Sequence, residues 1–347
     1  MSVDKKDFYS LSLDALSAWL VGMGEAPFHA RQVFHWAYQQ NARTFAEMTN
    51  VSKTLRESLD AAFEIGPLPI LKTAKGGDTT KLLLGLADSR SVECVRIAMR
   101  KADTACVSSQ VGCSVRCAFC ATGQTNCERS LTTGEMVRQV ISLNAAGANI
   151  GNIVFMGMGE PFHNYEGVVA AVRRFIDPAA FGISASRVTV STAGIVPMIR
   201  RYAQEGLPTE LAVSLNAPTD GLRRKLMPGV TRWPLDELLP ACREFSEAHR
   251  GQPVTFAYVL LDGVNDDFDQ AELLARLVRG QPHHVNLIPM NKVTHSSYKA
   301  PPNGRIQAFL QKLRAMHVNV SLRQSKGGGI EAACGQLKVA EREAGNA

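Results

Sequence analysis

From about residue 104 onward, short apolar segments with strand character alternate with amphipathic helical segments. This alternation predicts a parallel sheet covered by helices, because two parallel strands must be joined by a connection about as long as a helix. Six such strands fit an α/β fold, a partial (βα)6 TIM-like barrel, which places ligand sites at the C-terminal ends of its strands. The predicted strands are residues 104–108, 152–156, 187–191, 210–215, 254–260 and 284–289.

Helical periodicity predicts the elements that lie between the strands. The segment 133–144 carries its apolar residues on one face, and Thr132 with Glu135 has the pattern of a capping box at its start. The other predicted helices are residues 165–175, 235–248, 270–278 and 305–316.

The chain before the predicted barrel divides into two parts. Residues 1–60 are typical of a small helical accessory domain, with Leu13, Leu16 and Leu20 at helical spacing. Residues 61–103 predict a short β extension, with strands at 81–86 and 91–99. The barrel then occupies residues 104–325, and residues 326–347 form a C-terminal segment.

Three cysteines, Cys113, Cys117 and Cys120, lie in one loop directly after the first predicted barrel strand. Structural zinc sites usually use four protein ligands, commonly with two residues between paired cysteines. A cubane cluster has four irons, so three thiolates leave one iron free to bind another molecule. The spacing favours a [4Fe–4S] cluster. On the motif alone, a zinc site with a distant fourth ligand and three ordinary core cysteines remain alternatives.

Polar residues follow the other predicted strands. The second strand ends in a Gly-x-Gly-Glu-Pro motif, in which Gly159 lets the backbone approach a ligand and Glu160 can pair with an ammonium group. The motif is weak evidence alone, but its position one strand after the cysteine loop strengthens it. Side chains at the same rim that can hydrogen-bond a ligand, although each is also a common turn or cap residue, are Ser191, Ser214, Asn216 and Asn291.

Two further cysteines and one glutamate have two interpretations each. Cys106 precedes the cysteine loop and Cys334 lies in Ala-Ala-Cys-Gly-Gln-Leu near the C-terminus, yet buried free cysteines are common. Glu93 lies in an apolar strand. If it points inward, it needs a partner or a function; if it points to solvent, it needs neither.

Composition excludes several classes of protein. Hydrophobic residues make up 45% and charged residues 20%, and no stretch approaches the roughly 20 apolar residues of a membrane span. The N-terminus lacks an apolar signal region, so the eight cysteines predict metal or redox chemistry in a reducing cytoplasm rather than a disulfide framework. The net charge of +6 suits a nucleic-acid partner without establishing one.

Several of these motifs, over nearly the full length of the chain, resemble those of the radical S-adenosylmethionine (SAM) RNA adenosine methyltransferases, the RlmN/Cfr family. The helical stretch 45–55 also resembles the accessory domain of that family. The stretches that carry the resemblance are 106–120 (CVSSQVGCSVRCAFC), 152–161 (NIVFMGMGEP), 188–194 (VTVSTAG), 285–291 (VNLIPMN) and 332–337 (AACGQL).

The resemblance implies a mechanism that uses two SAM molecules per turnover. One SAM methylates Cys334. The second, chelated by the open iron of the [4Fe–4S] cluster, is cleaved to a 5′-deoxyadenosyl radical that takes a hydrogen from this methyl group. The resulting methylene radical adds to an adenine ring carbon, C2 being favoured over C8. Cys106 then attacks the Cys334 sulfur, which releases the methylated RNA and leaves a Cys106–Cys334 disulfide.

The resemblance also implies roles for other residues and partners. Glu93 aligns with the proposed proton acceptor of the family. The expected RNA is 23S ribosomal RNA, in some members also tRNA; the expected electron donor is flavodoxin, and the protein is expected to be a cytoplasmic monomer without membrane contact. The residues that align with SAM contacts are Gly159, Glu160, Ser191, Ser214, Leu215, Asn216 and Asn291.

Three departures from the family pattern concern the target RNA. Asn216 stands where the family usually has histidine, residues 292–295 (KVTH) replace a proline-rich turn, and residues 326–330 (KGGGI) replace a stretch with an arginine and an aspartate. They leave the chemistry intact and favour a divergent member. Two alternatives remain: the same chemistry on a non-RNA substrate, and a non-catalytic, zinc-stabilised RNA-binding protein.

Overall fold

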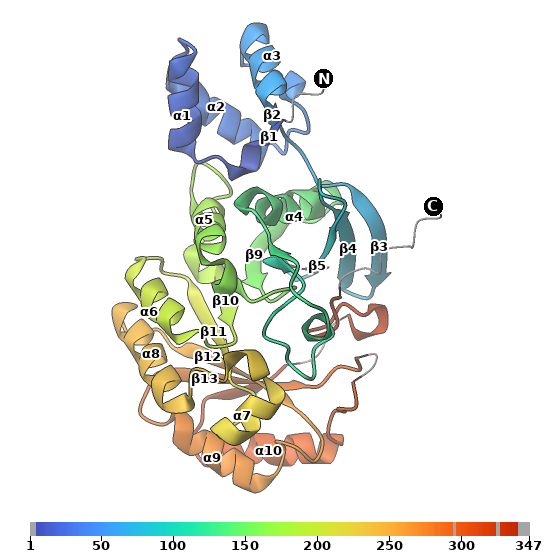
Figure 1. Cartoon of the computed structure of the whole chain (residues 1–347), viewed down its shortest axis with the longest axis vertical. Coiled ribbons are helices and arrows are strands. Elements are labelled where there is room, and N and C mark those ends of the chain that lie inside the picture. Colours follow the sequence, from blue (N-terminus) through green and yellow to red (C-terminus); the bar gives the residue numbers. More distant parts are fainter. Residues whose placement is uncertain (1–4, 294–295, 324–326, 339–347) are drawn as a thin grey trace.

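A ten-stranded sheet forms the centre of the computed structural model, which describes residues 5–293, 296–323 and 327–338 (Figure 1). Within these residues, neighbouring strands are parallel from β6 to β14. The predicted α/β alternation is confirmed. The sheet has one parallel strand more than the six predicted: β14, whose three residues are too few to show periodicity. The parallel strands are β6 (Asp103–Cys106), β9 (Ile150–Phe155), β10 (Val188–Thr192), β11 (Glu210–Ser214), β12 (Val254–Leu260), β13 (His283–Pro289) and β14 (Val320–Leu322).

Helices connect the parallel strands and pack along the outside of the sheet (Figure 1). The predicted capping box is present at the start of α4: Glu135 N–H donates to Thr132 Oγ1 at 3.1 Å, and Thr132 N–H donates to the Glu135 carboxylate at 2.8 Å. None of the described helices is long and apolar enough to cross a membrane. The helices are α4 (Thr133–Ala145), α5 (Tyr165–Ile176), α6 (Val196–Gln204), α7 (Asp220–Leu226), α8 (Leu235–Ala248), α9 (Phe268–Val278) and α10 (Asn303–Ala315).

The β extension continues the barrel sheet instead of forming a separate one. β5 (Ser91–Ile97) pairs antiparallel with β6, β4 (Thr79–Gly85) pairs with β5, and β3 (Ile70–Gly76) forms the edge. The sequence did not predict β3, because most of its side chains are exposed and show no alternation. The extension therefore lies directly beside the first barrel strand.

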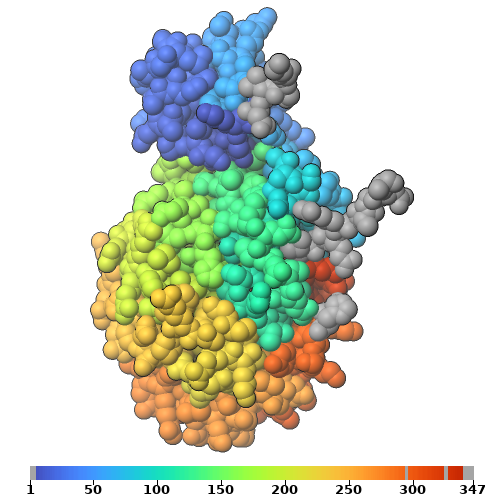
Figure 2. Space-filling model, in the orientation of Figure 1, coloured from blue at the N-terminus to red at the C-terminus, as the bar shows by residue number. Residues whose placement is uncertain are grey.

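Three helices form a lobe at one end of the molecule (Figures 1 and 2). They are α1 (Leu13–Gly22), α2 (Phe28–Phe34) and α3 (Lys53–Ala62), and the short parallel strands β1 (Lys6–Asp7) and β2 (Phe63–Glu64) close the lobe. The buried ring of Phe8 is central to its core, with the rings of Phe34 and Phe45 at 5.7 and 5.9 Å. Aromatic pairs at such distances stabilise a small core beyond the area that they bury.

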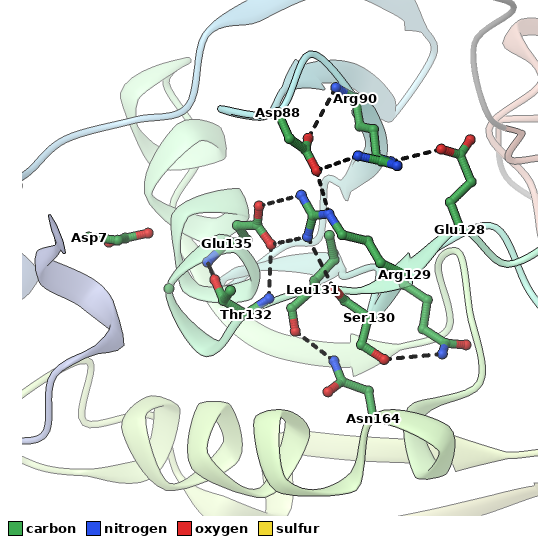
Figure 3. Close-up of polar contacts among 12 residues, drawn as sticks. Asp7, Asp88, Arg90, Glu128, Arg129, Ser130, Leu131, Thr132, Glu135 and Asn164 are labelled. Carbon is green, nitrogen blue, oxygen red and sulfur yellow. Dashed lines mark hydrogen bonds and ion pairs between the residues drawn. The ribbon is translucent and has the colours of Figure 1, made fainter. Parts of the chain in front are cut away.

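The lobe contacts α4 through Ser10 and Asp7. Gly134 N–H donates to Ser10 Oγ at 3.2 Å, and Asp7 lies beside the start of α4, 3.8 Å from Arg138 (Figure 3). Burial raises the pKa of Asp7 to about 6, although the Arg138 guanidinium opposes the rise. The protein therefore holds a proton on Asp7 at pH values where the unfolded chain has lost it.

Replacing Asp7 by asparagine should stabilise the protein at neutral pH. Because the pKa is raised in the folded state, stability is lost as pH rises from about 4 to about 6, where only the unfolded carboxyl is ionised. D7N removes this loss and should raise the free energy of unfolding at pH 7.5 by about 2 kcal/mol. Urea unfolding at pH 4 and pH 7.5 measures the difference in the free energy of unfolding between D7N and the natural protein. An equal difference at both pH values would contradict the prediction.

Candidate active site

The C-terminal ends of the parallel strands surround a cavity, and the cysteine loop forms one side of it. This cavity is called the barrel cavity below. Three predicted site residues, Glu93, Cys106 and Leu215, are outside its lining. The predicted residues that line it are Cys113, Cys117, Cys120, Gly159, Glu160, Ser191, Ser214, Asn216, Asn291 and Cys334.

The cysteine loop, residues 112–128, is closed at its base by a short ladder. β7 (Gln110–Val111) pairs antiparallel with β8 (Arg129–Ser130). Gly112 opens the loop with φ +85°, and a Cβ atom there would overlap the carbonyl of Asn126. Only glycine fits at this position, so Gly112 is required for the loop to turn here.

A charged network ties the end of the cysteine loop to the β extension and to α4 (Figure 3). Arg129 donates to Asp88 at 2.6 Å and to both carboxylate oxygens of Glu135 at 2.8 Å. Arg90 bridges Asp88 and Glu128 at 2.8 and 2.7 Å. Hydrogen bonds from Arg129 and Arg90 hold the pKa of Asp88 far below its ordinary value. The base of the loop is thereby fixed relative to the strands that carry the other site residues.

The thiols of Cys113, Cys117 and Cys120 lie half-buried in the wall of the barrel cavity. Burial raises the pKa of each, that of Cys113 to about 12, and the negative charges of Glu160 and of neighbouring thiolates raise those of Cys113 and Cys117 further. A metal centre reverses this effect, because a coordinating thiol is deprotonated. In the part of the chain that the structure describes, no three His, Cys, Asp or Glu side chains are arranged to hold one metal ion. Three thiols from one loop in the cavity wall are the donor set that an iron–sulfur cluster with one open iron would use.

Glu160 is 3% exposed and is held by three hydrogen bonds. Its Oε1 accepts from Phe162 N–H at 3.0 Å and Thr192 Oγ1 at 2.7 Å, and its Oε2 accepts from Ala193 N–H at 2.7 Å. Burial raises its pKa and these hydrogen bonds oppose the rise. A carboxylate has about four acceptor positions, so Oε2 keeps one position for a donor in the cavity.

Asn216 lines the barrel cavity, but its side chain is already engaged. Nδ2 donates to the Met227 sulfur at 3.2 Å, and Oδ1 accepts from Val259 N–H at 2.9 Å. Its φ of +56° is a conformation in which asparagine, aspartate and histidine are enriched. The requirement for this backbone explains why asparagine can replace the histidine expected there. Leu215 is fully buried, and its N–H donates to the Ala257 carbonyl at 2.9 Å.

A second cavity adjoins the first and is lined by the two further cysteines that the resemblance implies to be reactive. Cys106 and Cys334 line it, while Cys334 and Asn291 line both cavities. Asn291 Nδ2 donates to the Cys334 carbonyl at 2.9 Å, which fixes the backbone of Cys334 at the junction. Burial, followed by the nearby Cys334, raises the pKa of Cys106 to about 12. All eight cysteines are free, so the implied Cys106–Cys334 disulfide is not formed in this structure.

Arg323 also lines both cavities, and sequence analysis missed it. It directly follows β14, the strand that periodicity could not reveal, so its place at the rim of the barrel had no signal. Its Nη1 contacts the sulfur of Met156 at 3.9 Å, and its charge partly offsets the rise in the pKa of Cys106. A cation therefore stands beside the thiol that the resemblance implies to be the attacking one.

Glu93 points inward, which resolves the two interpretations of its strand. It is 7% exposed, and its Oε1 pairs with Lys81 Nζ at 2.8 Å. Its Oε2 accepts from Lys338 N–H at 2.9 Å. Glu93 lines neither of the two cavities, and its contact with the C-terminal segment that carries Cys334 is at Lys338.

The departures from the family pattern are described only in part. Thr294, His295 and Lys326 lie outside the described residues. Gly327 has φ +80° and faces Thr79 and Ala332, so its place between β4 and the Cys334 segment requires glycine. The carbonyl of Lys292 accepts from Gln336 Nε2 at 2.8 Å. The described parts of both segments thus support the Cys334 backbone.

Comparisons with known proteins agree with this geometry. Residues 6–65 match the family model of the ribosomal RNA large subunit methyltransferase N-terminal domain, and residues 107–275 match that of the radical SAM superfamily. A probable dual-specificity RNA methyltransferase RlmN of Moorella thermoacetica is 46% identical over 97% of this chain and 98% of its own length. The dual-specificity RNA methyltransferase RlmN of Pelobacter propionicus is 47% identical over 96% of each chain.

A solved structure gives the same result for the fold. A radical SAM methyltransferase from Sphaerobacter thermophilus superimposes with a TM-score of 0.92 at 44% identity, over 96% of this chain and 99% of that chain. The predicted radical SAM partial barrel is therefore confirmed. Relatives of this similarity, matched over almost their whole length, share one family with the chain. The protein belongs to the RlmN family of radical SAM methyltransferases.

Proposed function

We propose that this protein transfers a methyl group to a ring carbon of adenine in RNA, with C2 favoured over C8, through a methylated Cys334. The observation that carries the proposal is the position of Cys334, which lines both the barrel cavity with its three loop thiols and the second cavity with Cys106. One side chain thus reaches the place where SAM is expected and the thiol that would release the product.

The adenine ring makes such a carrier necessary. C2 and C8 are electron-poor carbons that cannot attack the methyl group of SAM, whereas a thiolate can. Cys113, Cys117 and Cys120 would hold the [4Fe–4S] cluster, and the free acceptor position of Glu160 would receive the ammonium group of SAM. When bound, the cluster supplies the one-electron reduction that cleaves SAM. Each turnover uses two SAM molecules, one to methylate Cys334 and one to be cleaved.

Release of the product depends on Cys106. Its thiolate attacks the sulfur of Cys334, a sulfur–sulfur bond forms, and the bond between the Cys334 sulfur and the transferred carbon breaks. The electron pair of the broken bond and a proton go to the transferred carbon, which is thereby reduced to the methyl group of the product. The two cysteines are thereby oxidised to a disulfide, and an external reductant returns them to thiols. The free state of both thiols and their shared cavity support this step. Glu93 as proton acceptor stays a prediction of the resemblance.

The substrate proposal draws on what the relatives are named for. They are dual-specificity RNA methyltransferases, and the model that matches residues 6–65 describes the N-terminal domain of ribosomal RNA methyltransferases. We propose 23S ribosomal RNA as the target, with tRNA as a second one, residues 6–65 as part of the RNA-binding lobe and flavodoxin as the electron donor.

Nucleoside mass spectrometry tests this function. Ribosomal RNA and tRNA from a strain that lacks the gene should contain no 2-methyladenosine at the target site, and the intact gene should restore it. Loss of 8-methyladenosine instead would show that the enzyme methylates C8 and not C2. Unchanged levels of both nucleosides in both RNAs would reject the proposal.

Metal analysis separates the enzyme from the zinc-protein alternative. Protein purified without oxygen should contain about four irons per chain. The triple variant C113A/C117A/C120A is the matched control and should contain none. Stoichiometric zinc in place of iron would contradict the cluster and, with it, the radical chemistry.

A further inference from the structure

Lys81 and Glu93 form a buried ion pair on one face of the β extension. β4 and β5 are paired so that Leu83 lies opposite Glu93, which places Lys81 and Glu93 on the same face in a diagonal position. Lys81 Nζ lies 2.8 Å from Glu93 Oε1, and the two side chains are 11% and 9% exposed. Taking two charges out of water is costly, so a pair in this position needs additional hydrogen bonds to be stable.

Those additional hydrogen bonds go to the main chain around the reactive cysteine. Lys81 Nζ donates to the carbonyl of Glu331 at 3.0 Å, and Glu93 Oε2 accepts from Lys338 N–H at 2.9 Å. Residues 331–338, called the carrier segment here, have Cys334 near their middle. One ion pair thus binds both ends of the carrier segment, and both oxygens of Glu93 are occupied.

The middle of the carrier segment is held differently. Asn291 binds the Cys334 carbonyl, and Ala121 N–H donates to the Gly335 carbonyl at 2.7 Å. Gly335 has φ +83°, so the chain turns sharply directly after Cys334. These contacts fix the backbone of the turn, while the Cys334 side chain faces the two cavities. The ion pair holds the two ends of the segment that contains this turn. Neither Lys81 nor Glu93 lines either cavity.

We propose that Lys81 and Glu93 are positioning residues that anchor the two ends of the carrier segment, so that Cys334 stays at the junction of the two cavities. Why Cys334 must be held in place rests on the proposed function. The anchoring contacts themselves are a physical property of the folded chain and do not depend on it. It gives the buried carboxylate of Glu93 a role that needs no proton transfer.

Hydrogen–deuterium exchange tests the anchor without any need for activity. K81M removes the contact to the Glu331 carbonyl, and K81M/E93L removes the contact to Lys338 N–H as well. In both variants the peptide covering residues 331–338 should exchange at least about tenfold faster. The double variant replaces the ion pair by apolar side chains, a change that buried pairs often tolerate, so it keeps the protein folded. K81R, which retains a cation, should restore much of the protection.

The control is K53M, which removes a lysine from the exposed Lys53–Glu57 pair and should leave exchange of the carrier segment unchanged. Unchanged exchange of the carrier segment in K81M/E93L would overturn the proposal, and so would an equal acceleration in all peptides of the protein. Acceleration confined to the carrier segment supports it.

Single-turnover assays connect the anchor to chemistry. Methylation of Cys334 by SAM should slow about tenfold in K81M while the KM for SAM changes less than about twofold, because the contacts in the barrel cavity are intact. E93Q keeps an oxygen that can accept from Lys338 N–H, so it should methylate Cys334 faster than K81M does. Full methylation by E93Q together with a complete loss of RNA product would assign Glu93 to proton transfer and overturn its role as an anchor. If RNA is not the substrate, exchange and Cys334 methylation still report on the anchor.

Discussion

Replacing Cys106 by alanine should trap the protein covalently on its RNA. Cys334 keeps its place at the junction of the cavities in this variant, so the methyl group can still be transferred and joined to adenine. The sulfur that would attack Cys334 and free the RNA is gone. Turnover should fall at least roughly a hundredfold, and denaturing gel electrophoresis should show an RNA-linked protein band.

Two further variants make this result specific. C334A should abolish both turnover and the adduct, because no thiol remains to carry the methyl group. C242A is the matched control: Cys242 is buried in α8 and lines neither cavity, so its removal should leave turnover within about twofold. A C106A protein that turns over freely without an adduct would refute the release step.

The parts of the site that sequence analysis predicted are those with a local signal. The capping box predicted the start of α4, and the three cysteines predicted a loop at the end of the first barrel strand. Glu160 could be predicted because its motif follows a clear strand. In each case the residues that carry the information are neighbours in the sequence.

The parts that sequence analysis missed depend on contacts between distant residues. Lys81 and Glu331 are 250 positions apart, and nothing near Lys81 indicates that its ammonium group binds a main-chain carbonyl. Glu93 left two interpretations open until its partners were known. Arg323 was missed because β14 has only three residues. The cost of burying a charge predicts that a partner exists, but only the fold identifies it.

The left-handed backbone of Asn216 is a further feature that sequence analysis missed. Sequence analysis treated the residue as a ligand-binding side chain in place of histidine. In the structure, the side-chain amide of Asn216 donates to the Met227 sulfur and accepts from Val259 N–H, so its first role is to hold the turn after β11. Positive φ has no reliable signature in a single sequence unless the residue is glycine.

Replacing Glu160 by glutamine should weaken SAM binding more than any other single change in the barrel cavity that leaves the cysteines intact. Glutamine loses the negative charge for the ammonium group, and its NH2 cannot accept from Ala193 N–H, which then stays buried without a partner. We expect affinity to fall roughly 100-fold, which is about 2.7 kcal/mol. Anaerobic equilibrium dialysis with SAM measures this loss.

T192V is the matched control for Glu160→Gln, because it leaves the charge in place. It removes the hydrogen bond from Thr192 to Oε1 and, with it, the acceptor of Gly194 N–H. It should weaken SAM binding less than about tenfold. Burial raises the pKa of Glu160, so the carboxyl gains a proton as pH falls through that raised value, and it then loses its attraction for the ammonium group. SAM affinity of the natural protein should therefore decline on acidification, while that of E160Q stays nearly level over the same range. Equal affinities, or parallel pH profiles, would show that the ammonium group binds elsewhere in the cavity.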